Sequence, residues 1–90
     1  MAIEIDIPPL LQTLAGDVKR VVTTGNTVGE CLDDLVKKYP GIKPKLLNRR
    51  GKLLNGINIF LNGENTFPEP LAKTVRSGDK IHIAFIVLGG

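Results

Sequence analysis

The side chains most often used in catalysis are scarce in this 90-residue chain, which has one histidine, His82, and one cysteine, Cys31. A metal centre needs three or four ligands, and a reactive thiol needs an exposed, electropositive setting. Cys31 falls on the apolar side of a predicted helix, and His82 alternates with inward-facing residues of a predicted strand. The sequence therefore predicts a core thiol, a surface histidine and no metal site.

The group with the clearest chemical use is the carboxylate that ends the run Phe85-Ile-Val-Leu-Gly-Gly90. The two final glycines have no side chains, so such a tail can enter a narrow channel. They do not follow a strand and open a helix, which argues against a phosphate-binding loop. A carboxylate is unreactive until it is activated, typically as an acyl-adenylate. The ending predicts a tail that threads into an activating enzyme.

Alternating apolar residues predict strands at 2–7, 57–62 and 80–87, and a fourth strand is predicted at 18–23 with a less clear face assignment. The inward-facing positions are Ile3, Ile5, Ile7, Ile57, Ile59, Leu61, Ile81, Ile83, Phe85 and Val87. Asn62-Gly63 is a strong signal for a tight turn. These strands predict a sheet with one buried face.

A single amphipathic helix is predicted to follow Thr27 and to end near Tyr39, before Pro40-Gly41. Thr27 and Glu30 have the spacing of a capping box. The apolar stripe of this helix consists of Val28, Cys31, Leu32, Leu35, Val36 and Tyr39. One helix and several strands predict an α+β domain over residues 1–90, with the helix on one face of a mixed four- to five-stranded sheet. A hairpin of the first two strands, with the last strand beside the first, would make it a β-grasp.

The connecting segments are predicted to be irregular. Leu10, Leu11 and Leu14 are expected to place a loop on the core, and residues 42–56 form a basic crossing. The segment 67–77 contains two prolines and is predicted to be a loop with a short edge strand. Its turn, Ser77-Gly78-Asp79, leads into the last strand.

Two surface features suggest partners. Phe60, Ala84, Ile86 and Leu88 fall on the sheet face opposite the helix, where they form an apolar partner surface unless residues 42–56 cover them. The basic excess of the chain, with a net charge of +3, gathers at Lys43, Lys45, Arg49, Arg50 and Lys52. That cluster is either a solvated loop or a docking patch for an acidic partner. The few aromatic residues argue against nucleic-acid binding.

Hydropathy and cysteine content indicate where in the cell the protein is expected. No apolar run approaches the roughly 20 residues of a membrane span. The single cysteine and the absence of a recognisable signal peptide favour a reducing cytoplasm.

The ordered set of motifs resembles the MoaD/ThiS family of ubiquitin-like sulfur carriers over essentially the whole chain. The matching pieces are Ile7-Pro8, Gly25-Asn-Thr-Val-Gly29, Tyr39-Pro-Gly-Ile42, Ile57-Asn-Ile-Phe-Leu-Asn62, Val75-Arg-Ser-Gly-Asp-Lys-Ile81 and Gly89-Gly90. The helix ending and the strand at 57–62 are most similar to the CysO-type carriers of cysteine biosynthesis. Many relatives have a proline shortly before the tail, and Ala84–Leu88 has none, so a longer last strand is expected.

This resemblance implies a β-grasp fold and a carrier without a bound cofactor, rather than an enzyme. An E1-like adenylyltransferase of the MoeB/ThiF type would use ATP and magnesium to adenylate Gly90. Sulfide or a persulfide would then displace AMP and leave a thiocarboxylate. Gly89 would be the threading residue, and Phe60, Ile86 and Leu88 are the candidate partner contacts.

The acceptor of the sulfur is left open by the resemblance. In CysO-type systems it is an activated serine derivative on a PLP-dependent cysteine synthase, and a metalloprotease then releases cysteine. In MoaD-type systems it is a pterin precursor on the large subunit of molybdopterin synthase. Two other classes are a modifier joined to lysines of target proteins and a binding module whose diglycine ending has no function.

Overall fold

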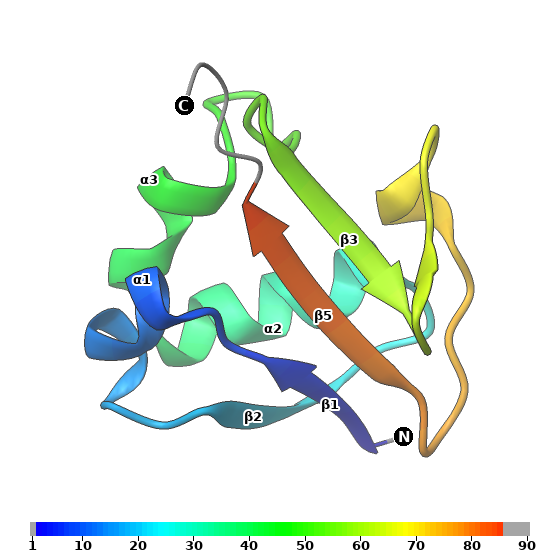
Figure 1. The fold of residues 1–90 in the computed structure, drawn as a ribbon, viewed down its shortest axis with the longest axis horizontal. Coiled ribbons are helices and arrows are strands. Elements are labelled where there is room, and N and C mark those ends of the chain that lie inside the picture. Colours follow the sequence, from blue (N-terminus) through cyan, green and yellow to red (C-terminus); the bar gives the residue numbers. More distant parts are fainter. Residues whose placement is uncertain (1, 86–90) are drawn as a thin grey trace.

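The computed structural model describes residues 2–85, in which five strands form one mixed sheet of order β2-β1-β5-β3-β4. The strands are β1 Ala2–Asp6, β2 Arg20–Thr24, β3 Ile57–Leu61, β4 Glu64–Asn65 and β5 Lys80–Phe85. β1 and β5 run parallel, and all other neighbours are antiparallel. The first two strands form a hairpin and the last lies beside the first, which confirms the predicted β-grasp (Figure 1).

The main helix, α2 Val28–Lys38, crosses one face of this sheet and lies behind it in Figure 1. The Thr27 side chain accepts a hydrogen bond of 3.1 Å from the Glu30 N–H, as the predicted capping box requires. The Glu30 carboxylate returns a bond to Asn26, one residue before the cap, by accepting its N–H at 3.0 Å. Both ends of the predicted helix are therefore confirmed to within one residue.

A glycine in the first turn of α2 is required by packing. A Cβ atom added at Gly29 would lie 2.9 Å from the carbonyl oxygen of Leu71, closer than a real side chain approaches. Leu71 belongs to a short 3-10 helix, η3 Pro70–Ala72, which packs against α2. Glycine is less favourable than alanine inside a helix, but here it allows the backbone of η3 to approach α2 closely.

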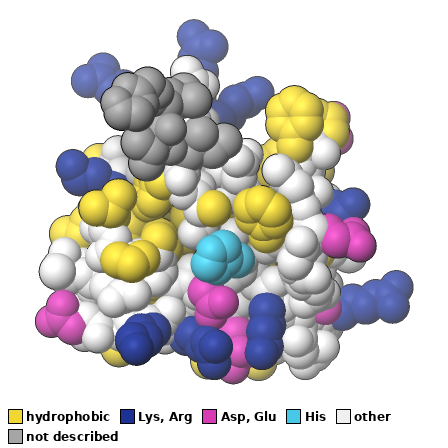
Figure 2. All heavy atoms as spheres, in the orientation of Figure 1, with side chains coloured by type: hydrophobic (Ala, Val, Ile, Leu, Met, Phe, Trp, Pro, Cys, Tyr) yellow, Lys and Arg dark blue, Asp and Glu magenta, His cyan; other side chains and the backbone are white. Residues whose placement is uncertain are grey.

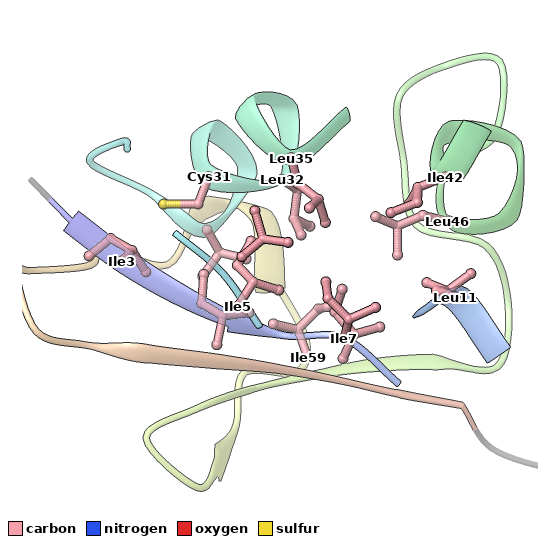
Figure 3. Packing of buried hydrophobic residues seen from close by; sticks show 14 of the residues in the cluster. Ile3, Ile5, Ile7, Leu11, Cys31, Leu32, Leu35, Ile42, Leu46 and Ile59 are labelled. Atoms are coloured by element: carbon pink, nitrogen blue, oxygen red, sulfur yellow. The ribbon is translucent and has the colours of Figure 1, made fainter. Parts of the chain in front are cut away.

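The core lies between α2 and the inner face of the sheet, and the close-up shows it continuing beneath the smaller helices (Figure 3). Its buried members are Ile3, Ile5, Ile7, Leu11, Ala15, Val21, Val28, Cys31, Leu32, Leu35, Ile42, Leu46, Leu47, Ile59, Val75, Ile81 and Ile83. The predicted inward positions of the strands and the helix stripe supply most of this set. Ile57, Leu61 and Phe85 are only partly buried, at its margin.

The segment after β1 differs from its prediction as a loop. It folds into α1 Pro9–Gln12 and a 3-10 turn, η1 Thr13–Ala15. Leu11 is buried, but Leu10 is 74% exposed and Leu14 36% exposed, so the prediction that all three contact the core is wrong. Successive residues of a helix point about 100° apart, and one short turn buries only one of two adjacent leucines.

The segment after α2 is also more regular than expected. Residues 42–56 were predicted to be irregular, whereas η2 Pro40–Ile42 continues directly into α3 Lys43–Leu46. A proline in the first turn of a helix lacks only a donor that the helix does not use, so Pro44 is compatible with α3. The buried residues Ile42 and Leu46 lie on the same side of the sheet as α2 (Figure 3).

Two strand positions also require correction. The second strand starts at Arg20 rather than residue 18, because Gly16 and Asp17 both have positive φ angles and complete the turn first. The short edge strand lies at Glu64–Asn65, directly after the Asn62-Gly63 turn, and not within 67–77. None of the helices formed by residues 2–85 has the length and apolar character needed to cross a bilayer.

Candidate functional site

The predicted reactive end is attached to the middle strand of the sheet. β5 lies between β1 and β3, and its last described residue, Phe85, is the Cα partner of Ile57. The predicted site residues Gly90, Gly89, Leu88 and Ile86 lie outside the described residues. What the structure defines is their point of attachment, a strand held by neighbours on both sides.

Phe60 is the one predicted partner contact that the structure describes. It lies on β3, half-buried, on the sheet face opposite α2. Its Cα partner on β5 is His82, and the two rings meet edge-on with centroids 6.5 Å apart and an interplanar angle of 63°. Ala84, also half-buried, is two residues further along β5 on the same face. These two apolar residues lie on the outer face, as predicted.

A row of charged side chains crosses the same face beside Phe60. Arg20 Nε donates a hydrogen bond of 2.9 Å to Asp6 Oδ1. The other carboxylate oxygen, Asp6 Oδ2, lies 3.6 Å from Nδ1 of His82, whose side chain is 57% exposed. Strand register places these groups together, because Asp6 pairs with Arg20 on β2 and with His82 on β5. The row ends at the apolar ring of Phe60.

Figure 2 shows this outer face directly, with the single histidine near its centre. Hydrophobic side chains lie above and beside the histidine, and acidic and basic side chains gather below it. The face therefore has an apolar half, towards the end of β5, and a charged half, towards the start of β5. Such a division fixes the orientation of a partner, because only one placement matches both halves.

The alternative that residues 42–56 cover this face is wrong for the described structure. Ile42, Leu46 and Leu47 are buried in the core on the side of α2, and Leu47 pairs with Leu53 in an isolated bridge. The crossing therefore closes one end of the inner core. Phe60 and Ala84 keep part of their surface in contact with solvent.

Cys31 and His82 occupy the positions expected for residues without catalytic roles. Cys31 is fully buried, and burial raises the pKa of its thiol, so the thiol stays protonated and unreactive. Within residues 2–85, no group of three His, Cys, Asp or Glu side chains is arranged to hold a metal ion.

Two surface features were not predicted. The Arg20–Asp6–His82 row depends on strand register, which the alternation of apolar residues does not specify. The second feature is a groove of about 740 Å3 between residues 52–58 and 67–72, which requires two distant segments to meet. Its lining includes Phe67, 78% exposed. An exposed phenylalanine between loop residues was the only sequence signal for it.

Comparison with a family model identifies the chain. The model described as the ThiS family matches residues 5–90, which is nearly all of the sequence. The match includes the end of β1, all of the other four strands and the five residues beyond Phe85.

Individual relatives give the same result. The chain is 34% identical to the sulfur carrier protein CysO of Mycobacterium tuberculosis, over all of both chains. In the crystal structure of the Amycolatopsis orientalis BexX/CysO complex, a chain superimposes with a TM-score of 0.88 at 37% identity, covering 99% of this chain and 100% of that one. Small archaeal modifier protein 1 of Haloferax volcanii is 33% identical over 71% of this chain and 70% of its own. In sequence, the likeness to the sulfur carrier protein CysO covers more of this chain than the likeness to the modifier does.

Proposed function

This chain belongs to the ThiS family, and from that membership we propose that it is a sulfur carrier of the CysO type whose Gly90 carboxylate is converted to a thiocarboxylate. The observation that carries the proposal is the 34% identity to the sulfur carrier protein CysO over the full length of both chains. The protein is a co-substrate of its partner enzymes. It is consumed and regenerated in the reaction rather than acting as the catalyst.

The proposed chemistry takes place at one carboxylate. An oxygen of Gly90 attacks the α-phosphorus of ATP, which forms the acyl-adenylate and releases pyrophosphate. Hydrosulfide then attacks the acyl carbon, a C–S bond forms, and the bond to AMP breaks. The magnesium ion and the ATP belong to the activating enzyme. The carrier supplies a carboxylate on a stem that fits the enzyme's channel, with glycine at positions 89 and 90.

The geometry of the chain suits delivery of this group. The five residues after Phe85 span at most about 18 Å when fully extended. The β-grasp domain itself measures 37 × 29 × 25 Å. The carboxylate therefore reaches a partner's interior while the domain stays at the entrance, and domain surfaces near the end of β5 must face the partner.

The apolar half of the outer face is the proposed contact for these partners. Phe60 and Ala84 lie on that face, and Ile86 and Leu88 continue the same alternation in sequence. Clustered apolar residues are typical of interface centres. A partner that binds this patch is held directly above the root of the tail.

The proposed partners act in sequence. The first is an E1-like adenylyltransferase of the MoeB/ThiF type, which activates and sulfurates Gly90. The second is the sulfur acceptor, a PLP-dependent cysteine synthase in a CysO-type pathway. A complex of CysO with BexX has been crystallised, which supports the proposal that this chain also binds partner proteins. We place these steps in the cytoplasm, where ATP is available.

Two alternatives keep the same activation step and differ in the acceptor. A MoaD-type carrier would bind the large subunit of molybdopterin synthase. A protein modifier would transfer Gly90 to lysines of other proteins, and the partial similarity to small archaeal modifier protein 1 is the observation that favours it. Both would still require adenylation of Gly90.

The test is the intact mass of the protein purified from its native host, with fragmentation to locate any change. Replacement of one oxygen by sulfur at Gly90 is the expected result. Unmodified carboxylate together with lysine-linked conjugates would favour the modifier. Unmodified carboxylate without conjugates, also after incubation with ATP, sulfide and the adenylyltransferase of the same genome, would contradict both.

A further inference from the structure

The positive charge of this chain is concentrated in one stretch. Between Leu35 and Gly63 there are seven lysines and arginines and no aspartate or glutamate, whereas all nine acidic residues lie elsewhere. Five of the seven cations are exposed and close together in sequence: Lys43, Lys45, Arg49, Arg50 and Lys52. We call these five residues the basic cluster.

Among residues 2–85, only two lysines and arginines form ion pairs, and neither belongs to the basic cluster. Arg20 contacts Asp6 at 2.9 Å, and Lys38 contacts Asp34 at 3.1 Å. Among residues 2–85, no carboxylate lies within ion-pair distance of any member of the cluster. These five charges therefore repel one another without compensation from the described part of the fold, and an external anionic surface would relieve that repulsion.

Three members of the cluster are held in place by an ordered turn at residues 48–52. The side-chain oxygen of Asn48 accepts the N–H of Arg50 at 2.8 Å and that of Lys52 at 3.1 Å. The Asn48 N–H donates to the Lys52 carbonyl at 2.7 Å. Gly51 completes the turn with a φ of +78°, which favours glycine.

The turn is also anchored on both sides. Leu47, only 7% exposed, forms an isolated bridge with Leu53, so the core holds the base of the turn. A rigid turn loses little conformational entropy when a partner binds its side chains. The backbone that carries Arg49, Arg50 and Lys52 is therefore preorganised for contact with a surface.

The cluster is connected to the end of the strand that carries the tail. The Leu54 N–H donates to the Leu46 carbonyl at 3.0 Å, and the Ile57 N–H donates to the Leu54 carbonyl at 3.3 Å. Ile57 is the Cα partner of Phe85. In Figure 1 the turn and the end of β5 lie at the same end of the molecule, and Figure 2 shows basic side chains gathered there.

We propose that the basic cluster binds an acidic protein surface at the mouth of the active site that receives the C-terminal tail. The proposal rests on the proposed function only in requiring an enzyme that takes up the tail. Opposite charges beside the entrance raise the association rate and bring the tail to the channel in the correct orientation. The apolar patch of Phe60 then supplies the contact that persists after docking. A nucleic acid is the less favoured ligand, because the cluster itself contains no aromatic side chain for base stacking.

The test measures thiocarboxylate formation by the adenylyltransferase of the same genome, with ATP, sulfide and increasing concentrations of full-length carrier. The variant Arg49→Glu/Arg50→Glu/Lys52→Glu is compared with a control, Lys19→Glu/Lys73→Glu/Arg76→Glu. Both variants change the net charge by the same amount, and all six positions are exposed. Circular dichroism melting curves verify that both variants remain folded.

The expected result is a rise of tenfold or more in the KM for the cluster variant at low salt, with little change in kcat, and a rise of less than threefold for the control. Added NaCl should raise the KM of the unaltered carrier and have little effect on the cluster variant. Equal KM values for the two variants would overturn the proposal. So would unchanged KM values accompanied by loss of RNA binding in the cluster variant alone. If the unaltered carrier forms no thiocarboxylate, the proposed function fails first, and this inference fails with it.

Discussion

The two faces of the sheet have different tasks, although the same strands build both. On the inner face, β1 contributes Ile3 and Ile5, both fully buried beneath α2. On the outer face, the same strand contributes Glu4 and Asp6, and Asp6 forms an ion pair with Arg20 on β2 and lies 3.6 Å from His82 on β5. The inner face supplies the free energy of folding, and the outer face exposes charged and apolar side chains, which makes it the proposed partner surface.

This division shows how so small a domain serves as a carrier. A buried reactive centre would disturb a core that has only 17 buried hydrophobic residues in the described part of the chain, because unpaired polar groups are costly to bury. The described side-chain polar atoms of the interior are satisfied instead, for example by the Thr23 hydroxyl, which donates to the Ile3 carbonyl at 3.0 Å. Reactive and recognition groups therefore lie outside the core, where they change without cost to folding.

Removal of the tail is the most direct test of this separation between folding and function. Deletion of Gly89 and Gly90 should abolish adenylation, because the activated carboxylate would end on a side chain that the channel does not admit. The melting temperature should be unchanged, because the buried hydrophobic core is built from residues between Ile3 and Ile83. ATP–pyrophosphate exchange and circular dichroism measure the two effects. A truncated protein that is still adenylated normally would refute the carrier mechanism.

The next largest effect is expected on the free energy of unfolding, when each of two adjacent valines of β2 is replaced by alanine. Val21 points into the core at 6% exposure, and Val22 points out at 54%. Val21→Ala should lower the free energy of unfolding by about 2 kcal/mol, because buried methyl groups are lost and a cavity remains. Val22→Ala should change it by less than about 0.5 kcal/mol. Urea denaturation measures both, and equal costs would show that the outer face also contributes to folding.

The inner face was largely predictable from sequence, because its pattern is local. Alternation identified Ile3, Ile5 and Ile59, and the helical repeat identified Leu32 and Leu35, all of which are buried. Each of these predictions depends only on the period of a strand or a helix. The prediction that Thr27 caps the helix was equally local, since its hydrogen-bond partner lies three residues away.

The outer face was less predictable, because its features depend on pairings between distant segments. Asp6, Arg20 and His82 come together only through two strand registers, one antiparallel and one parallel. The ordered turn at Asn48 depends on side-chain hydrogen bonds that the sequence allows but does not require. Short helices such as α1 were missed because four residues are too few to show a repeat.

A smaller effect, on the KM of the adenylyltransferase reaction, is expected when an apolar side chain of the outer face is removed. Phe60→Ala should raise the KM of the adenylyltransferase reaction about tenfold, equivalent to about 1.4 kcal/mol of lost contact, with kcat unchanged. Val22→Ala is the matched control, since it also removes an exposed apolar side chain from the outer face, but on the far edge strand. Similar KM values for the two variants would contradict the assignment of Phe60 as a partner contact.

The smallest expected effect concerns a charged contact that links β2 to α2. Asp34 Oδ2 accepts a hydrogen bond from Lys38 at 3.1 Å and from the Thr24 N–H at 3.0 Å, and these bonds lower the pKa of its carboxyl group below the ordinary value of 3.8. A carboxyl group with a lowered pKa in the folded state stabilises the fold above its unfolded pKa. That contribution is lost as the pH falls through the folded-state pKa.

Asp34→Asn should therefore lower the free energy of unfolding slightly at pH 7, and the difference from the unaltered protein should shrink below pH 4. Urea denaturation at a series of pH values measures it, with Asp33→Asn as the control on the same turn of α2. The contact is solvent-exposed, so high salt should weaken the effect. A difference that stays constant from pH 7 to pH 2 would show that the stabilisation does not come from the charge of Asp34.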